Sequence, residues 1–169
     1  MEAITIGQAQ KLTSPNPFAL LTVPTPDGRT NVMALSWWTY VSNHPAMVAV
    51  CLSQKGYSGG CIAASGSFGL SVVGKALAAP AAGAGGCSGR SVDKAAELGI
   101  PLFQPEQFSL PVVEGSRVCL SCRLKDTLTV GDHVLYVGEV EAVLGDPSAE
   151  ALFAMDGYAR LEALSGQAK

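Results

Sequence analysis

The stretch Asn31–Ser53, NVMALSWWTYVSNHPAMVAVCLS, consists of two apolar runs joined by the polar corner SNHPA, and it holds both tryptophans of the chain. A strand over Asn31–Tyr40 sends successive side chains to opposite faces, and both faces are mostly apolar here. One face carries Asn31, Met33, Leu35 and Trp37, and the other carries Val32, Ala34, Ser36 and Trp38. We therefore expect both faces to be covered, one by a barrel interior and the other by a partner or a flat ligand, with packing by protein alone as the alternative.

The segments on either side of this run predict neighbouring strands. FALLTVP, at Phe18–Pro24, is apolar. The Pro26-Asp27-Gly28 that follows combines a fixed φ, a local side-chain acceptor and a residue that tolerates positive φ, which is typical of a turn. With a further strand at Met47–Ser53, the chain has three successive strands with short connections, and this indicates an antiparallel meander.

Later segments predict two short helices and three more strands. Tyr57, Cys61 and Ala64 recur at helical spacing, which predicts a helix over Ser58–Ser65. In SVDKAAELG, Ser91 is the expected N-cap of a second helix and Gly99 follows its end. The strands are SFGLSVVG at 67–74, RVCLSCRLKDTLTV at 117–130 and HVLYVGEVEAVLG at 133–145, the last two joined in a hairpin by Gly131-Asp132.

Three remaining segments have weaker patterns. Lys75–Gly89 is rich in Ala and Gly, so we expect a flexible or close-packed connector with at most one helical turn. IPLFQPEQFSLPVVEGS, at 100–116, is interrupted by prolines and predicts an irregular surface crossing. The tail Asp146–Lys169 fits a short helix or a last strand equally well. The whole pattern indicates a mainly β protein, a β-barrel with short helices, because so many strands need their edges paired or covered.

The composition is apolar and lightly charged. The 169 residues are 48% hydrophobic and 15% charged, which suits one domain with part of its surface buried against a second subunit. A net charge of −3 gives no basic field for nucleic acid. The start MEAITIGQAQKLT has no signal-peptide pattern, and apolar runs end well before the about 18 residues of a membrane span, so we expect a cytoplasmic protein without a membrane partner. The five cysteines have no regular spacing, which predicts reduced thiols.

Metal binding is poorly supported by the sequence. Cys119 and Cys122 form a C-x-x-C, but this spacing in a strand sends the two thiols to opposite faces, and no second Cys or His pair follows. His44 and His133 are far apart, and His44 reads as a corner residue before Pro45. We therefore predict no metal site.

The run SQKGYSGG, at 53–60, has the chemistry of a phosphate site. It brings three hydroxyls and one ammonium to the start of the helix predicted over Ser58–Ser65, where free backbone N–H groups favour an anion. These groups belong to Ser53, Lys55, Tyr57 and Ser58. Neither a G-x-G-x-x-G behind a strand nor a G-K-[ST] is present, so an ordinary serine cap beside a solvated lysine stays as the alternative.

Taken together, several segments resemble the flavin reductase-like family, the FMN-binding split barrels that include flavoredoxin. They are the long run from NPFALLTV to SFGLSVVG, then SGRSVDK, CRL and GDHVLYVGEVEAV. The resemblance extends from about Pro17 to Val143. No single motif identifies the family, but the order and spacing of the motifs do. D-G-x-x-N is followed by S-W, and a strand that ends in Ser precedes a helix that begins with Ser. Later, G-D-H precedes a β-run that ends in G-E-V.

This resemblance implies a single FMN-binding domain over 1–169, folded as a six-stranded Greek-key split barrel, and a homodimer with FMN at or near the interface. It also implies that Asn31–Trp37 passes beside the flavin ring and that Ser53–Ser58 takes the phosphate. His133 is the candidate catalytic residue, orienting nicotinamide or flavin, with a hydrogen-bonded strand-start residue as the alternative. The implied cofactor-binding residues are Asn31, Met33, Ala34, Leu35, Ser36, Trp37, Ser53, Gln54, Lys55, Tyr57, Ser58 and Lys94.

The implied activity is that of an FMN-dependent NAD(P)H oxidoreductase, in which hydride passes from NADH or NADPH to the flavin and electrons pass onward to an acceptor. Two alternatives are a flavoredoxin-like electron-transfer protein served by a redox protein donor, and a barrel without flavin that acts as a binding dimer. The sequence departs from the family pattern at Ala34, at Ala95 and in the Ala-Gly connector. These departures predict either a wider cofactor pocket or weaker retention of FMN.

Overall fold

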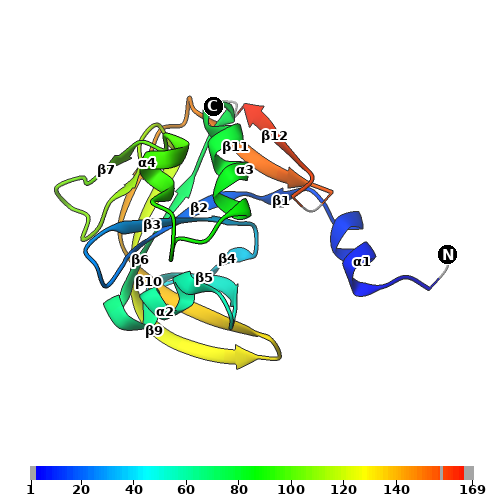
Figure 1. Cartoon of the computed structure of the whole chain (residues 1–169), viewed down its shortest axis with the longest axis horizontal. Coiled ribbons are helices and arrows are strands. Elements are labelled where there is room, and N and C mark those ends of the chain that lie inside the picture. Colours follow the sequence, from blue (N-terminus) through cyan, green and yellow to red (C-terminus); the bar gives the residue numbers. More distant parts are fainter. Residues whose placement is uncertain (1–2, 157, 166–169) are drawn as a thin grey trace.

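Seven antiparallel strands form the main sheet, in the order β3-β2-β6-β9-β10-β5-β4 (Figure 1). The computed structural model describes residues 3–156 and 158–165. The hairpin predicted around Gly131-Asp132 is confirmed, with strands of thirteen residues each. The strands of this sheet are β2 (Ala19–Pro24), β3 (Thr30–Leu35), β4 (Trp38–Asn43), β5 (Ala46–Ser53), β6 (Ser67–Val72), β9 (Val118–Val130) and β10 (His133–Gly145).

The strand predicted over Asn31–Tyr40 is wrong as a single element, because the chain leaves the ladder at Ser36 and Trp37. Before this break β3 pairs with β2, and after it β4 pairs with β5. The predicted meander is therefore interrupted, and the main sheet has seven strands where six were implied. Since β3 and β4 are the two end strands of the sheet and adjoin in the chain, the sheet must curl until its ends meet. This curling makes the barrel.

Helix α2 (Tyr57–Ser65) begins one residue before the helix predicted there and ends at Gly66, which has a left-handed φ of 69°. Helix α4 (Lys94–Leu98) ends at Gly99 as predicted, but its N-cap is Asp93 and not Ser91, since the Asp93 carboxylate accepts the Ala96 N–H. Side-chain capping by Asp satisfies an amide that the helix itself leaves unpaired.

The Ala-Gly connector is mainly helical, which corrects the prediction of at most one helical turn. A 3-10 turn, η1 (Lys75–Leu77), leads into α3 (Ala78–Gly86). Glycine disfavours helix, but Ala81 and Ala84 are fully buried against the barrel wall. Packing of small side chains therefore stabilises a helix that its composition does not predict.

The segment 100–116 is not a surface crossing, and this prediction is wrong. It contains the pair β7 (Leu102–Phe103) and β8 (Val112–Val113), and Phe108, Leu110 and both β8 valines are buried. The prolines interrupt regular pairing, yet the apolar side chains between them still pack onto the barrel.

The described part of the C-terminal tail forms strands and not a helix. β11 (Glu150–Met155) lies between β1 (Asn16–Pro17) and β12 (Arg160–Ser165) in a second sheet.

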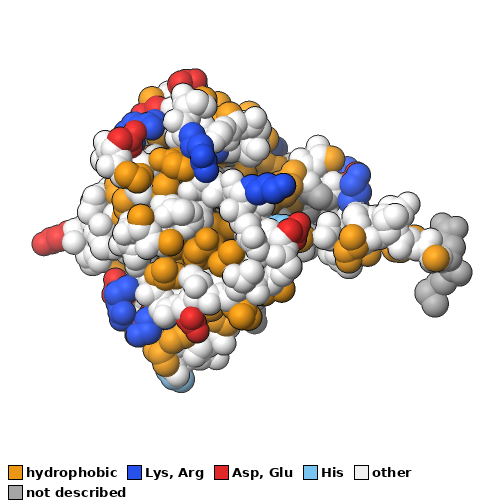
Figure 2. Space-filling view, turned by 60° about the horizontal axis from the view of Figure 1, so that its bottom comes forward, with side chains coloured by type: hydrophobic (Ala, Val, Ile, Leu, Met, Phe, Trp, Pro, Cys, Tyr) orange, Lys and Arg blue, Asp and Glu red, His pale blue; other side chains and the backbone are white. Residues whose placement is uncertain are grey.

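The N-terminal lead-in contains a helix that the sequence reading did not predict. Helix α1 (Ile6–Leu12) begins with a capping box, in which Thr5 and Gln8 bond each other's backbone N–H. It lies at one side of the barrel, where Gly7, Gln10 and Lys11 line a cavity with Trp37 and His133, and none of its residues is buried (Figures 1 and 2). Ile6 and Leu12 are 77% and 74% exposed, so the described residues leave these apolar side chains of the helix largely uncovered.

Two hydrophobic clusters lie on opposite sides of β2 and β3. Leu21 and Leu35 belong to the barrel interior, whereas Leu20 and Val32 belong to an outer cluster with α3 and β11. Both faces are thus covered, and the outer face packs on α3 and β11 of the same chain, as in the alternative of packing by protein alone. Cover by a partner or a flat ligand stays a prediction. Cys119 and Cys122 also lie in different clusters, as their spacing predicts. Among the described residues, no helix is long and apolar enough to cross a membrane.

Candidate functional site

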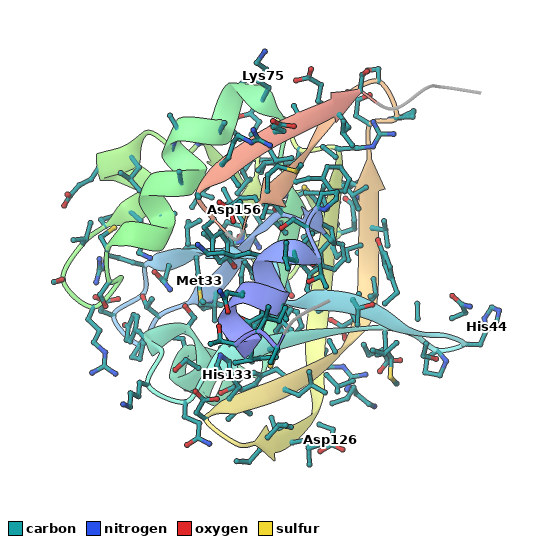
Figure 3. The ribbon with its side chains drawn as sticks, turned by 90° about the vertical axis from the view of Figure 1, so that its right-hand side faces the viewer. Met33, His44, Lys75, Asp126, His133 and Asp156 are labelled. Atoms are coloured by element: carbon teal, nitrogen blue, oxygen red, sulfur yellow. The ribbon has the colours of Figure 1, made fainter. Side chains whose placement is uncertain are left out.

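Three adjoining cavities follow β3, and Met33 lines all of them (Figure 3). The basic cavity, about 350 Å³, lies at the start of α2, and the aromatic cavity, about 450 Å³, lies at the break after β3. The apolar cavity, about 330 Å³, lies between β3, α3 and β12. Their distinguishing residues are Asn31, Lys55, Ser58, Arg90 and Lys94 in the basic cavity, Phe18, Ala82 and Leu161 in the apolar cavity, and Ser36, Trp37, Ser53 and His133 in the aromatic cavity.

The basic cavity is built from buried polar side chains. Asn31, Ser58 and Lys94 are each no more than 5% exposed. The Asn31 amide Nδ2 donates to Ser58 Oγ at 2.9 Å, and Lys94 Nζ donates to the Ala84 carbonyl at 2.7 Å. Burial lowers the pKa of Lys94 below its ordinary value. Asn31 Oδ1 is buried and accepts no hydrogen bond within the described residues, so the cavity offers an acceptor to a ligand donor.

The start of α2 adds backbone donors to the same cavity. Its N-cap is Gly56, which has no side chain to bond the amides of the first turn. Lys55 and Arg90 line the cavity beside these amides, and the Arg90 guanidinium lies 5.5 Å from the centre of the Tyr57 ring. Gly89 is required here because a Cβ at this position would overlap the Asn31 side chain. The cavity therefore has the donor set of an anion site.

The aromatic cavity is more open and is lined by rings. The centres of the Trp37 and His133 rings are 5.0 Å apart, tilted by 37°. His133 Nδ1 lies 2.7 Å from Asp132 Oδ1, and this hydrogen bond lowers the pKa of Asp132. Trp37 is 43% exposed. The cavity can therefore take a flat ring on one side while leaving that ring accessible from solvent.

The structure brings together eleven of the twelve predicted cofactor-binding residues along the three cavities, with His133 beside them. Gln54 is the exception: its Nε2 donates to the Gly131 carbonyl at 2.7 Å, and it lines none of the three cavities. It holds the hairpin turn, and its contact with a cofactor stays a prediction. The residues on the cavities are Asn31, Met33, Ala34, Leu35, Ser36, Trp37, Ser53, Lys55, Tyr57, Ser58 and Lys94.

Arg90 and Tyr158 are among the lining residues that the sequence reading missed. Arg90 lies in SGRSVDK, four residues before Lys94, so its closeness to a predicted site residue was the available signal. Tyr158 comes from the tail, and its Oη accepts hydrogen bonds from the Ser36 backbone N–H and Ser36 Oγ. No local sequence pattern links residues 36 and 158, because only the packing of the second sheet on the barrel brings them together.

This geometry defines a class of protein: a split β-barrel with an anion site at a helix N-terminus and a ring-lined cavity beside it. Within that class the assignment is specific, since the flavin reductase like domain matches residues 12–162. The chain belongs to the flavin reductase-like family, and the resemblance seen in the sequence is confirmed. The predicted fold class, a mainly β split barrel, is confirmed as well.

Solved structures of this fold come from several organisms. The flavoredoxin of Methanosarcina acetivorans is 24% identical with a TM-score of 0.84, over 100% of this chain and 95% of that one. An NADH:FAD oxidoreductase of Streptomyces globisporus is 20% identical with a TM-score of 0.84, over 98% of each chain. An FMN-binding protein of Thermus thermophilus is 25% identical with a TM-score of 0.80, over 94% of this chain and 91% of that one.

Among curated relatives, the uncharacterized protein YddH of Escherichia coli is 30% identical over 146 residues, which are 85% of this chain and 77% of that protein. Uncharacterized proteins of Archaeoglobus fulgidus and Aeropyrum pernix are 28% and 27% identical over 66% and 69% of this chain. These matches span 63% and 44% of the relatives' own lengths. The matches thus cover less than two thirds of these two relatives' own lengths.

Proposed function

We propose that this protein binds FMN and acts as an NAD(P)H-dependent flavin oxidoreductase. The observation that carries the proposal is the basic cavity, where the buried Lys94, the uncapped start of α2 and the unpartnered Asn31 Oδ1 converge next to a ring-lined cavity. A phosphate monoester joined by a polyol to a flat ring matches this sequence of environments. Proteins of similar fold include one named for FMN binding.

The residues present fit FMN. Lys55, Ser58 and Lys94, with the first amides of α2, would hold the phosphate, because charged donors and a helix N-terminus favour a dianion. Asn31 Oδ1 would accept a hydrogen bond from a ribityl hydroxyl, and this bond would satisfy a buried acceptor that is otherwise unpaired. Trp37 and Met33 would provide apolar contact for the ring.

When bound, the flavin supplies the redox chemistry: it accepts a hydride equivalent and passes electrons to an acceptor. The task of the chain is to bind and orient. Buried donors in the basic cavity fix the position of the cofactor. Because Trp37 is exposed, the aromatic cavity leaves one face of the flavin ring open to a nicotinamide. His133, fixed by Asp132, is the candidate for orienting that nicotinamide.

A flavoredoxin-like electron carrier is the second candidate. Apolar side chains are exposed beside the aromatic cavity: Trp37 at 43%, and Val130, the pairing partner of His133, at 53%. Such a surface suits a protein donor. The same exposed groups, together with Ile6 and Leu12 of α1, support the proposed homodimer. All five cysteines are free thiols, which supports the proposed cytoplasmic location.

One experiment tests the proposal and separates its two forms. Purified protein is titrated with FMN, and the complex is mixed without oxygen with NADH or NADPH in a stopped-flow instrument. We expect saturable binding at one site per chain and bleaching of the flavin absorbance by one of the nucleotides. If FMN binds but neither nucleotide bleaches it, the protein is an electron carrier and the oxidoreductase proposal is wrong. If FMN does not bind, both proposals are wrong. Sedimentation of the same samples tests the homodimer.

A further inference from the structure

Tyr158 connects the second sheet to the site on the barrel. It lies in the turn between β11 and β12, and its ring packs edge-on against Phe18 with 6.1 Å between the centres. Its Oη accepts the Ser36 N–H at 2.8 Å and Ser36 Oγ at 3.0 Å. In Figure 3 this turn, marked by Asp156, lies on one side of Met33 and His133 lies on the other.

Ser36 can make these bonds because it belongs to neither ladder. The β2–β3 pairing ends at Leu35, and the β4–β5 pairing begins at Trp38. The Ser36 N–H is therefore a backbone donor that needs a partner from elsewhere in the fold. Tyr158 provides that partner although the ring itself is 54% exposed.

The two bonds from Ser36 determine what the Tyr158 hydroxyl can still do. A phenolic oxygen can accept hydrogen bonds and has one hydrogen to donate. Tyr158 Oη is the acceptor in both bonds with Ser36, and no described residue accepts its hydrogen, so this hydrogen can be donated to a ligand. The Tyr158 side chain lines both the apolar and the aromatic cavity. A ring held beside Met33 would thus meet a fixed O–H donor at its edge.

We propose that Tyr158 is a ligand-binding residue that donates a hydrogen bond to a carbonyl oxygen on the edge of the bound ring. The inference rests on the proposed function, under which the ring is the flavin and its pyrimidine edge carries two carbonyl groups. Negative charge gathers on that edge when a flavin is reduced, so a donor there binds the reduced form more tightly than the oxidised form. Tyr158 therefore sets both cofactor affinity and reduction potential.

The test compares Tyr158→Phe with a matched control, Tyr40→Phe. Tyr40 is 59% exposed and lines none of the three cavities. We expect Tyr158→Phe to weaken FMN binding about three- to tenfold, the usual contribution of one neutral hydrogen bond, and to make the midpoint potential of the bound flavin more negative. Tyr40→Phe leaves both unchanged. With 2-thio-FMN or 4-thio-FMN, whichever lacks the contacted oxygen, the effect of Tyr158→Phe largely disappears.

If Tyr158 only holds the turn between β11 and β12 on the barrel, the result will be different. If Tyr158→Phe changes only stability, or if it tightens FMN binding, the inference is overturned while the proposed function stands. If the unaltered protein does not bind FMN, the proposed function and the inference fall together.

Discussion

The basic and aromatic cavities lie on the same strand but are built in opposite ways. In the basic cavity the polar side chains of Asn31, Ser58 and Lys94 are almost completely buried and bonded to one another or to the backbone. In the aromatic cavity Trp37 and Tyr158 are 43% and 54% exposed. Buried, hydrogen-bonded groups are preorganised, whereas exposed rings gain most of their contact only when a ligand arrives.

This difference separates two requirements of a flavin enzyme. A cofactor must stay in one position through many turnovers, which calls for a rigid charged anchor. Its reaction partners must come and go, which calls for an open surface. We therefore expect substitutions in the basic cavity to change cofactor affinity strongly and substitutions in the aromatic cavity to change it weakly.

The largest effect is expected for Lys94→Met. This change keeps an unbranched side chain that is one heavy atom shorter and removes its charge, so FMN affinity should fall about ten- to a hundredfold, the contribution of a hydrogen bond to a charged group. The loss of the bond to the Ala84 carbonyl should cost about 1 to 3 kcal/mol of stability, and thermal unfolding of the variant measures this loss. Fluorescence titration measures the affinity. Lys75→Met, at an exposed lysine outside the three cavities, is the control and should bind normally.

A smaller effect is expected from pH. Because burial lowers the pKa of Lys94, its ammonium loses its proton at a lower pH than a free lysine does. A bound phosphate favours the charged form, so FMN binding takes up protons and weakens as pH rises. Titrations from about neutral pH up to the ordinary lysine pKa of about 10.5 should show this decline. In Lys94→Arg the charge persists, and the decline should be shallower; equal slopes in the two proteins would contradict this role of Lys94.

The smallest effect is expected for Trp37→Ala. The ring is nearly half exposed and contacts His133, so its loss should weaken FMN binding by about threefold or less. Tyr40→Ala, another exposed aromatic on the same stretch, controls for general surface effects. A loss of affinity as large as that of Lys94→Met would contradict the proposal that the basic cavity anchors the cofactor and the aromatic cavity contributes little to its affinity.

Much of the fold was predictable from local patterns. The β9–β10 hairpin follows from alternation on both sides of Gly131-Asp132, and α2 follows from its helical spacing. The break at Ser36 was not predictable, because its cause is closure of the barrel and not any helix- or strand-breaking residue. Helix α3 was missed for a similar reason: burial of Ala81 and Ala84 outweighs the weak helical preference of its glycines.

The candidate site divides in the same way. Ser58 and Lys55 could be predicted because a strand, a basic loop and a helix start follow directly in sequence. Arg90 and Tyr158 reach the cavities only through tertiary packing, by way of the loop after α3 and the second sheet. The Ala-Gly connector predicted a wider pocket, and Gly85 and Ala34 do line both the basic and the apolar cavity.

The break after β3 has a consequence for how this surface can change over time. The Ser36 amide belongs to the main chain, so replacing the serine can remove its hydroxyl but leaves its N–H in position unless proline is introduced. Drift in side chains can alter the rings around the aromatic cavity while this donor persists. Barrels with the same break can therefore diverge far in sequence and still keep a backbone donor for a side chain in the position of Tyr158.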